Sequence, residues 1–358
     1  MKVLFISYVD FGAVESGSAV RPQQMYRAFV ERGHEVTLLS GSIGRDCGRT
    51  RKEAVDRILA WLDGERPDLC YIESPTYPLL HECDYALIRR LCAMKIPTAY
   101  FYRDFYRRFP ALFPRRTDAL GRLKELYLDF MQGRTDWLLR RVDIVYFPSA
   151  ACTKMFSYRR MLPLPPAGED HVPSPHPNNR TCIYVGGVSA SYGIGLLIDS
   201  FRLLNAGGCR YRLILVCREG EYERERERIG EHEWLTVCHA SGAALEPLYA
   251  QADVGLLSLV DNEYNNFAVG TKLFQYLSYG LPVLSTDVEA MRELIEADGL
   301  GLTAAGDPES YAAAIRSLLD DDERLASARE RAVRALRERH LWVHRVDRIV
   351  RELTEGAQ

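Results

Sequence analysis

The stretch Cys182-Ile183-Tyr184-Val185-Gly186-Gly187 decides the fold, because it restarts a pattern that the chain has already shown once. A short apolar run that ends in a glycine-rich loop is typical of a parallel strand buried on both faces. The first copy begins at Val3–Ile6, passes a loop that contains Gly12 and Gly17, and enters a helix at about Pro22. The sequence therefore predicts two α/β halves, each a doubly wound parallel sheet.

Apolar and helical segments alternate along both halves, and this alternation sets the expected domains. The expected strands are residues 3–6, 35–39, 69–72, 98–102 and 144–147 in the first half, and 182–185, 213–217, 235–238, 254–257 and 282–285 in the second. Six prolines within residues 162–179 argue against regular structure there, so we place an interdomain linker at 166–180. The expected domains are therefore 1–165 and 181–335, followed by a final helical segment at 336–358.

The composition narrows the class of protein. The 358 residues carry a net charge of −3, which argues against a protein that coats nucleic acid. No apolar stretch approaches the ~18 residues that cross a bilayer. We therefore expect a cytoplasmic protein that meets the inner membrane face, if at all, from its surface. The nine cysteines form no CxxC pair, and His340 and His344 lack an acidic partner pattern, so we expect buried, reduced thiols and no metal.

Two glycine-rich turns occupy matching places, at 12–17 and 186–193. Phosphates bind at turns of this kind, where a strand leads into a helix and backbone N–H groups face the ligand. Ser18 and Arg21 follow the first turn closely. Neither turn matches GxGxxG or the Walker pattern, so an ordinary tight turn explains each equally well and a nicotinamide-dependent enzyme is disfavoured.

A more specific signal lies within residues 270–283, where Lys272 and Gln275 fall three apart in the opening turn of a predicted helix. Side chains three apart share one face of a helix. A cation there can meet phosphate, and an amide one turn later can reach ribose hydroxyls. The alternative is a surface lysine and glutamine on an amphipathic helix.

This stretch resembles glycosyltransferase family 4, which carries Lys-Leu-x-Glu-Tyr-x-x-x-Gly-x-Pro-Val where this chain has Lys272 to Val283. Further pieces similar to that family are Gly33-His34-Glu35-Val36, Ala252-Asp253-Val254-Gly255-Leu256, Glu293-Leu294-Ile295 with Gly299, and Trp342. The resemblance implies a GT-B fold and retaining transfer from a UDP-, GDP- or other nucleotide sugar without an essential cofactor. It also implies an acceptor on 1–165, the donor on 181–335, and a helix at 336–358 that crosses back to the first domain.

The chain departs from the family at the donor site. Gln275 replaces a ribose-binding glutamate, Phe267 replaces an earlier glutamate, and Gly187 and Tyr192 replace an arginine and a lysine. The predicted donor-binding residues are Gly186, Gly187, Arg218, Glu263, Lys272, Leu273 and Gln275. The predicted N-terminal residues that meet acceptor or diphosphate are Gly12, Gly17, Ser18 and Arg21, with Arg21 the expected cation that arrives on closure.

Arg103-Asp104 follows the strand where the family usually has a histidine, often as His-Asp. Asp104 is the predicted base or sugar-binding carboxylate, and inversion stays open if it is a true base. An Arg-Asp pair that only orders its loop is the alternative.

Residues 100–141 hold ten Arg or Lys against five Asp or Glu, interleaved with aromatic residues. This mixture suits an anionic membrane surface or a lipid-linked acceptor, with Arg107, Arg108, Arg115 and Arg116 as the expected contacts. A solvated helix with an aromatic stripe toward the core is the alternative. A glycan, a lipid-linked sugar and a small molecule remain open as acceptors in polysaccharide or glycoconjugate biosynthesis. A nucleotide-sugar epimerase and a catalytically inactive GT-B scaffold remain open as functions.

Overall fold

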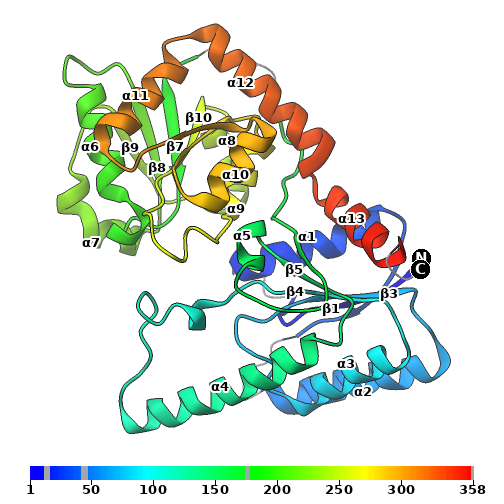
Figure 1. Ribbon diagram of the computed structural model, residues 1–358. Helices are drawn as coiled ribbons and strands as arrows, with labels where there is room; N and C mark the ends of the chain where they lie inside the picture. The colour runs from blue at the N-terminus through cyan, green and yellow to red at the C-terminus, as the bar shows by residue number, and fades with distance from the viewer. Residues whose placement is uncertain (12–16, 42–46, 174–177, 356–358) are drawn as a thin grey trace. The chain divides into compact units, whose positions relative to one another are not determined.

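The computed structural model describes residues 1–11, 17–41, 47–173 and 178–355. The chain divides into two compact units. Unit 1 combines Met1–Pro165 with Trp342–Gln358, and unit 2 is Pro166–Leu341. Figure 1 shows that each unit is a sheet with helices on both faces.

Unit 1 is built on a six-stranded parallel sheet of order β2-β1-β3-β4-β5-β6. Its strands are β1 (Lys2–Ile6), β2 (Glu35–Leu39), β3 (Leu69–Glu73), β4 (Thr98–Phe101), β5 (Ile144–Phe147) and β6 (Met161–Pro163). Its helices are α1 (Gly17–Glu31), α2 (Gly48–Gly64), α3 (Glu82–Ala93), α4 (Ala119–Leu139), α5 (Ala150–Thr153) and α13 (Trp342–Glu355), with a short turn η2 (Tyr106–Arg108).

Unit 2 repeats the plan with the strand order β12-β11-β10-β7-β8-β9, again parallel. Its strands are β7 (Thr181–Val185), β8 (Arg212–Val216), β9 (Leu235–Cys238), β10 (Val254–Leu257), β11 (Val283–Thr286) and β12 (Gly301–Ala304). Its helices are α6 (Ile194–Leu204), α7 (Glu219–Ile229), α8 (Glu246–Tyr249), α9 (Thr271–Ser278), α10 (Glu289–Asp298), α11 (Pro308–Leu319) and α12 (Asp322–Ala335), with short turns η3 (Ala190–Tyr192), η4 (Gly242–Leu245) and η5 (Leu336–His340). Two buried apolar clusters form its core.

The prediction of two doubly wound parallel sheets is confirmed. The proline-rich region was expected to be irregular, but its first residues form β6, which pairs with β5 through Tyr146↔Leu162 and Phe147↔Pro163. Proline is tolerated there because β6 is an edge strand, where a missing N–H breaks no ladder. Helix α7 and strand β12 lay outside the predicted elements.

The chain returns to unit 1 at its end, as the predicted crossover helix requires. Helix α13 packs against α1, and Arg32 Nη2 lies 2.5 Å from Asp347 Oδ2. The buried residues of α13 include Trp342, Val346, Ile349 and Leu353. Their spacing of three to four residues makes one apolar stripe that docks the helix on unit 1. In the part of the chain that the structure describes, no helix combines the length and the apolar character needed to cross a membrane.

Candidate functional site

Helix α9 opens at the carboxyl edge of the second sheet, and its first two turns carry Lys272 and Gln275. Its N-cap is Gly270, which carries no side chain to hold the first-turn N–H groups. Leu273, Phe274 and Tyr276 are fully buried in the core. These residues bury one face of the helix in the core. Lys272 and Gln275, which are three apart, share the other face.

Lys272 is partly buried and pairs with no carboxylate among the described residues. Burial lowers the pKa of its ammonium group to about 8, and no opposite charge offsets that effect. An ammonium that has lost water without gaining an anion is costly to keep. The position therefore favours an anionic ligand.

Gln275 presents the second unsatisfied group. Its Oε1 atom is buried and accepts no hydrogen bond from any residue that the structure describes. A buried acceptor without a donor costs about 1–3 kcal/mol. A ligand hydroxyl on this face would remove that cost, and Lys272 lies one turn away.

The loop between β7 and α6 follows the same edge. Gly186 N donates to Val216 O at 3.0 Å, and the Tyr184 hydroxyl donates to Gly187 O at 2.7 Å. A Cβ at Gly187 would stand 2.5 Å from Cε2 of Tyr192, so the Tyr192 ring fills the space above this glycine. The two positions where the resembled family has cations are therefore occupied by an aromatic ring lying on a glycine.

Asparagines order the loop between β10 and α9. Asn262 Oδ1 accepts from Asn265 N at 2.9 Å, and Asn265 Nδ2 donates to Val260 O at 2.7 Å. Asn266 Oδ1 accepts from Glu289 N at 2.8 Å, which ties the loop to the start of α10. These residues were not predicted to belong to the site, although asparagine is a common signal for turns held by side-chain hydrogen bonds.

The other predicted donor-binding residues differ in how exposed their side chains are. Arg218 is exposed at the end of β8 and pairs with Glu221 at 3.2 Å. Glu263 is exposed on the asparagine-ordered loop. Leu273 is fully buried, so its side chain serves the core and only its backbone is left to meet a ligand.

In unit 1, Arg21 is buried in a network rather than left as a free cation. Its Nε atom lies 3.1 Å from Glu73 Oε1, and its guanidinium lies 3.5 Å from the centre of the Phe101 ring. The Tyr71 hydroxyl also donates to Glu73, at 2.7 Å. Gly17 and Ser18 open α1, and Gly12 lies outside the described residues.

Arg103 and Asp104 form an ion pair at the end of β4, with Nε 3.0 Å from Oδ2. Arg103 also donates to Thr76 Oγ1 at 3.0 Å, and its backbone N–H donates to Ser74 Oγ at 2.9 Å. These bonds order the loops after β3 and β4. This is the structural role that was considered as the alternative to a catalytic role for Arg103 and Asp104.

A second buried ion pair, Arg51 with Asp84, lies at the same edge and was not predicted from the sequence. Arg51 Nε donates to Asp84 Oδ1 at 3.0 Å, and Arg51 Nη1 donates to Ser7 O at 3.2 Å. The partners come from α2 and α3, so no local pattern in the sequence joins them.

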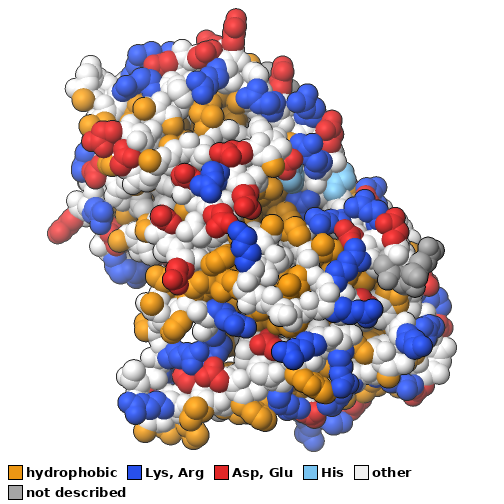
Figure 2. All heavy atoms as spheres, viewed as in Figure 1, with side chains coloured by type: hydrophobic (Ala, Val, Ile, Leu, Met, Phe, Trp, Pro, Cys, Tyr) orange, Lys and Arg blue, Asp and Glu red, His pale blue; other side chains and the backbone are white. Residues whose placement is uncertain are grey.

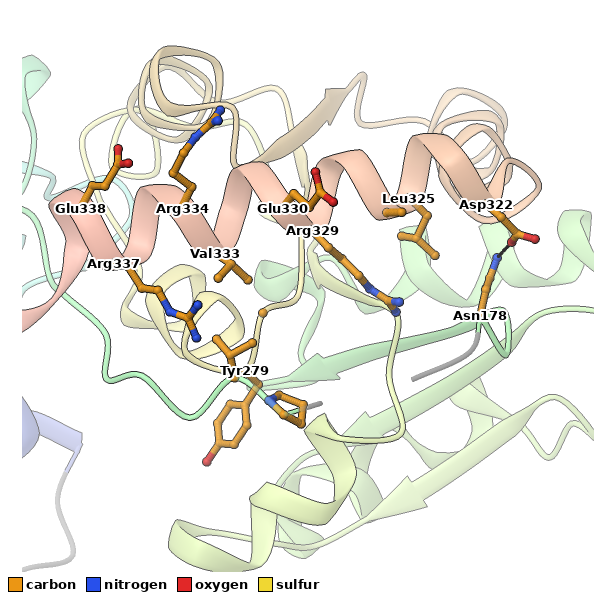
Figure 3. Close-up of a pocket in the computed structure, with 14 residues that line it drawn as sticks. Asn178, Tyr279, Asp322, Leu325, Arg329, Glu330, Val333, Arg334, Arg337 and Glu338 are labelled. Carbon is orange, nitrogen blue, oxygen red and sulfur yellow. Dashed lines mark hydrogen bonds between the residues drawn. The ribbon is translucent and has the colours of Figure 1, made fainter. Parts of the chain in front are cut away.

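A cavity of about 950 Å³ lies elsewhere in unit 2, beside α12. Figure 3 shows Leu325, Arg329 and Val333 of that helix, and Arg337 of η5, directed toward the side on which Tyr279 lies. Two of its lining residues, Asn178 and Gly280, precede β7 and β11, so the cavity lies near the amino ends of the strands. Ligands of open α/β sheets bind at the carboxyl ends, where α9 begins. The opening of α9, and not this cavity, is therefore the candidate site.

A family model matches most of unit 2. Residues 179–321 match the family model of glycosyl transferases group 1. The matched segment contains the β7–α6 loop, Arg218, the asparagine-ordered loop and α9. No curated protein sequence matches the chain significantly.

Solved structures share the whole fold. HepE from Anabaena in complex with UDP aligns over 99% of this chain and 100% of its own, with 16% identity and a TM-score of 0.65. WaaG, a glycosyltransferase involved in lipopolysaccharide biosynthesis, aligns over 97% and 98%, with 17% identity and a TM-score of 0.61. A UDP-forming α,α-trehalose-phosphate synthase from Burkholderia xenovorans, in complex with glucose-6-phosphate, aligns over 99% and 100%, with 14% identity and a TM-score of 0.62. These neighbours show that the chain has the two-domain GT-B fold, and the family match links residues 179–321 to glycosyl transferases group 1.

Proposed function

We propose that the protein transfers a sugar from a nucleotide-diphosphate donor to an acceptor hydroxyl, with the donor on unit 2 and the acceptor on unit 1. The observation that carries the proposal is the pair of unsatisfied groups on α9, the Lys272 ammonium and Gln275 Oε1. The diphosphate would meet Lys272 and the first N–H groups of α9. A ribose hydroxyl would donate to Gln275.

The donor would be held with few cations. Tyr192 and Gly187 occupy positions where the resembled family has basic residues, and Arg218 is the nearest substitute in sequence on the same edge. Backbone N–H groups and Lys272 would therefore carry most of the diphosphate charge. HepE was solved with UDP and with UDP-glucose, so these are the first ligands to test.

Transfer with retention of the anomeric configuration fits this set of residues. In a front-face reaction the leaving phosphate accepts the acceptor's proton, and the protein stabilises the leaving diphosphate electrostatically. Asp104 is held by Arg103, which favours a role in positioning a hydroxyl over a role as free base. The proposal requires neither a metal nor a cofactor, because Lys272 and the N–H groups would neutralise the leaving group.

Calorimetric titration with UDP, GDP and ADP tests the site. We expect one nucleotide to bind the wild type and to bind Lys272→Ala at least tenfold more weakly. The matched control is Arg334→Ala, which removes a positive charge from α12 near the large cavity and should leave binding unchanged. Equal affinity in wild type and Lys272→Ala would refute the assignment of α9.

Activity assays with nucleotide sugars distinguish a glycosyltransferase from an inactive scaffold and from an epimerase. Slow hydrolysis of the matching nucleotide sugar, with release of free sugar, is expected from a transferase that lacks its acceptor. Binding without hydrolysis or transfer would favour the inactive scaffold, and interconversion of two nucleotide sugars would favour the epimerase.

A further inference from the structure

Helix α4 has two apolar faces, and only one of them is buried. The buried residues are Gly121, Leu128, Met131, Thr135, Leu138 and Leu139. The large apolar residues exposed along the same helix are Leu120 (78%), Leu123 (66%), Leu126 (67%), Tyr127 (39%), Phe130 (64%) and Trp137 (51%). A single exposed leucine needs no explanation, but a row of large apolar side chains on one element marks an interaction surface.

Helical spacing gathers most of these residues into one stripe. Leu123, Phe130 and Trp137 are seven apart, and Leu126 lies one turn from Leu123 and from Phe130. Residues at these spacings share a face, and this face is opposite the one that packs on unit 1. We call Leu123, Leu126, Phe130 and Trp137 the outer stripe.

The acidic residues around the outer stripe are already neutralised. Arg107 Nη1 lies 2.6 Å from Glu125 Oε2, and its Nη2 lies 2.6 Å from Asp129 Oδ1. Arg115 also pairs with Asp129 at 2.9 Å, and Arg116 pairs with Asp118 at 3.0 Å. Three of the four arginines expected to meet a membrane are thus in close ion pairs, and Arg108 lies 3.9 Å from Asp136.

Other cations remain free along the helix. Arg122, Lys124 and Arg140 are exposed and form no ion pair among the described residues. Arg141 lies with its guanidinium 4.1 Å from the Trp137 ring centre. Figure 2 shows apolar atoms exposed at the lower left of the molecule, the region where α4 begins in Figure 1, with Lys and Arg atoms beside them. The outer stripe is therefore apolar along its centre and positively charged at its margins.

We propose that the outer stripe of α4 docks on the surface of an anionic lipid bilayer, with the helix lying in the plane of the interface. Apolar side chains enter the boundary of headgroups and acyl chains, while flanking Lys and Arg contact lipid phosphates. Trp137 belongs to the class of side chain enriched at that depth. The proposal does not depend on sugar transfer, although it would bring a lipid-linked acceptor to unit 1.

Charge favours a bilayer over a second copy of the chain. A twofold pairing of α4 helices would bring the unpaired Arg122, Lys124 and Arg140 of two copies toward one another. Juxtaposed like charges oppose such a pairing, whereas an anionic lipid surface attracts them.

Flotation with vesicles tests the proposal on the full chain. Wild-type protein should float with vesicles of phosphatidylcholine and phosphatidylglycerol, and less with phosphatidylcholine alone. Leu123→Ser/Leu126→Ser/Phe130→Ser and, separately, Arg122→Gln/Lys124→Gln/Arg140→Gln should each lower binding to anionic vesicles at least tenfold. The matched controls are Leu203→Ser, an exposed leucine on α6, and Arg334→Gln, and both should bind as the wild type does.

A second readout guards against misfolded variants. The tryptophan fluorescence of the wild type should shift to shorter wavelength on anionic vesicles, and Trp137→Phe should lose most of that shift while still floating. Failure of the wild type to float with anionic vesicles would overturn the proposal. The proposal would also be overturned if the wild type sedimented as a dimer, the triple serine variant sedimented as a monomer, and neither bound vesicles. Nucleotide binding is measured separately, so failure of the donor site leaves this test intact.

Discussion

The Tyr192 ring lies against Gly187, so closely that a Cβ on the glycine would stand 2.5 Å from the ring. Gly187 does not have a left-handed backbone, so the ring and not the backbone conformation excludes a side chain. Tyr192 is held from the other side, because Ser258 Oγ donates to its carbonyl at 2.9 Å. Tyr192 and Gly187 therefore pack together at the two positions where the resembled family has cations. The hydrogen bond from Ser258 ties the β7–α6 loop to the end of β10.

Gly187→Ala should lower the free energy of unfolding by about 1 kcal/mol, because the half-exposed ring has to move aside. In a Tyr192→Ala background the same change should cost less than about 0.5 kcal/mol. Urea denaturation of the four proteins of this cycle measures the coupling. Equal costs in both backgrounds would show that the ring does not restrict position 187.

Lys272→Met should stabilise the unliganded protein at pH 7, by roughly 1–2 kcal/mol after allowance for partial solvent exposure. The pKa of Lys272 is lowered by burial from 10.5 to about 8, so the unfolded chain binds the proton more tightly than the folded one. The penalty in the wild type is therefore complete below pH 8 and disappears as pH rises toward 10.5. Urea denaturation from pH 7 to 10 should show the advantage of the variant shrinking, whereas exposed Arg334→Met should show no such trend. An advantage that grows with pH would contradict this sign.

Gln275→Met should stabilise the unliganded protein by about 1 kcal/mol, because it removes a buried acceptor that has no donor. The same change should weaken nucleotide binding about five- to tenfold, since a ribose hydroxyl loses its partner. Melting curves and calorimetric titration measure the two effects. Inorganic pyrophosphate, which lacks a ribose, should bind the variant and the wild type equally; weakened pyrophosphate binding would place Gln275 elsewhere in the site.

Arg21→Met should destabilise the protein by about 3–5 kcal/mol, because it leaves the Glu73 carboxylate buried without its counter-ion. Adding Glu73→Gln should recover much of the loss, since the remaining group no longer carries a charge. Urea denaturation of the single and double variants measures both. A stable Arg21→Met variant with weakened nucleotide binding would instead support the role in diphosphate binding that was predicted from the sequence.

Local pattern predicted most of the fold. Strands β5, β9 and β10 have the predicted boundaries, because short apolar runs between polar loops leave little choice of register. Strand β12 was missed, because Gly301–Ala304 is a weakly apolar run that begins with glycine. Helix α7 is almost entirely charged and lacks the apolar periodicity on which a prediction depends.

The candidate site was predictable only where its residues are neighbours in the chain. Lys272 and Gln275 share one turn, so their common face follows from helical geometry. Arg51 and Asp84 meet across 33 positions, and nothing local links them. The exposed Cys209 likewise departs from the expectation of buried thiols, because burial depends on what packs over a residue.

By itself the sequence determined the two parallel sheets and placed Lys272 and Gln275 in one helical turn, because periodicity and short motifs are properties of adjacent residues. The crossing back of the last helix was expected only from the family resemblance. Only the tertiary structure decided which charges are free to act. Arg21 is engaged by a carboxylate 52 positions away and Arg107 by carboxylates 18 and 22 positions away, whereas Lys272, Arg122 and Lys124 have no such partner among the described residues. The strength of an ion pair depends on distance in space and on burial, and neither is set by distance along the chain.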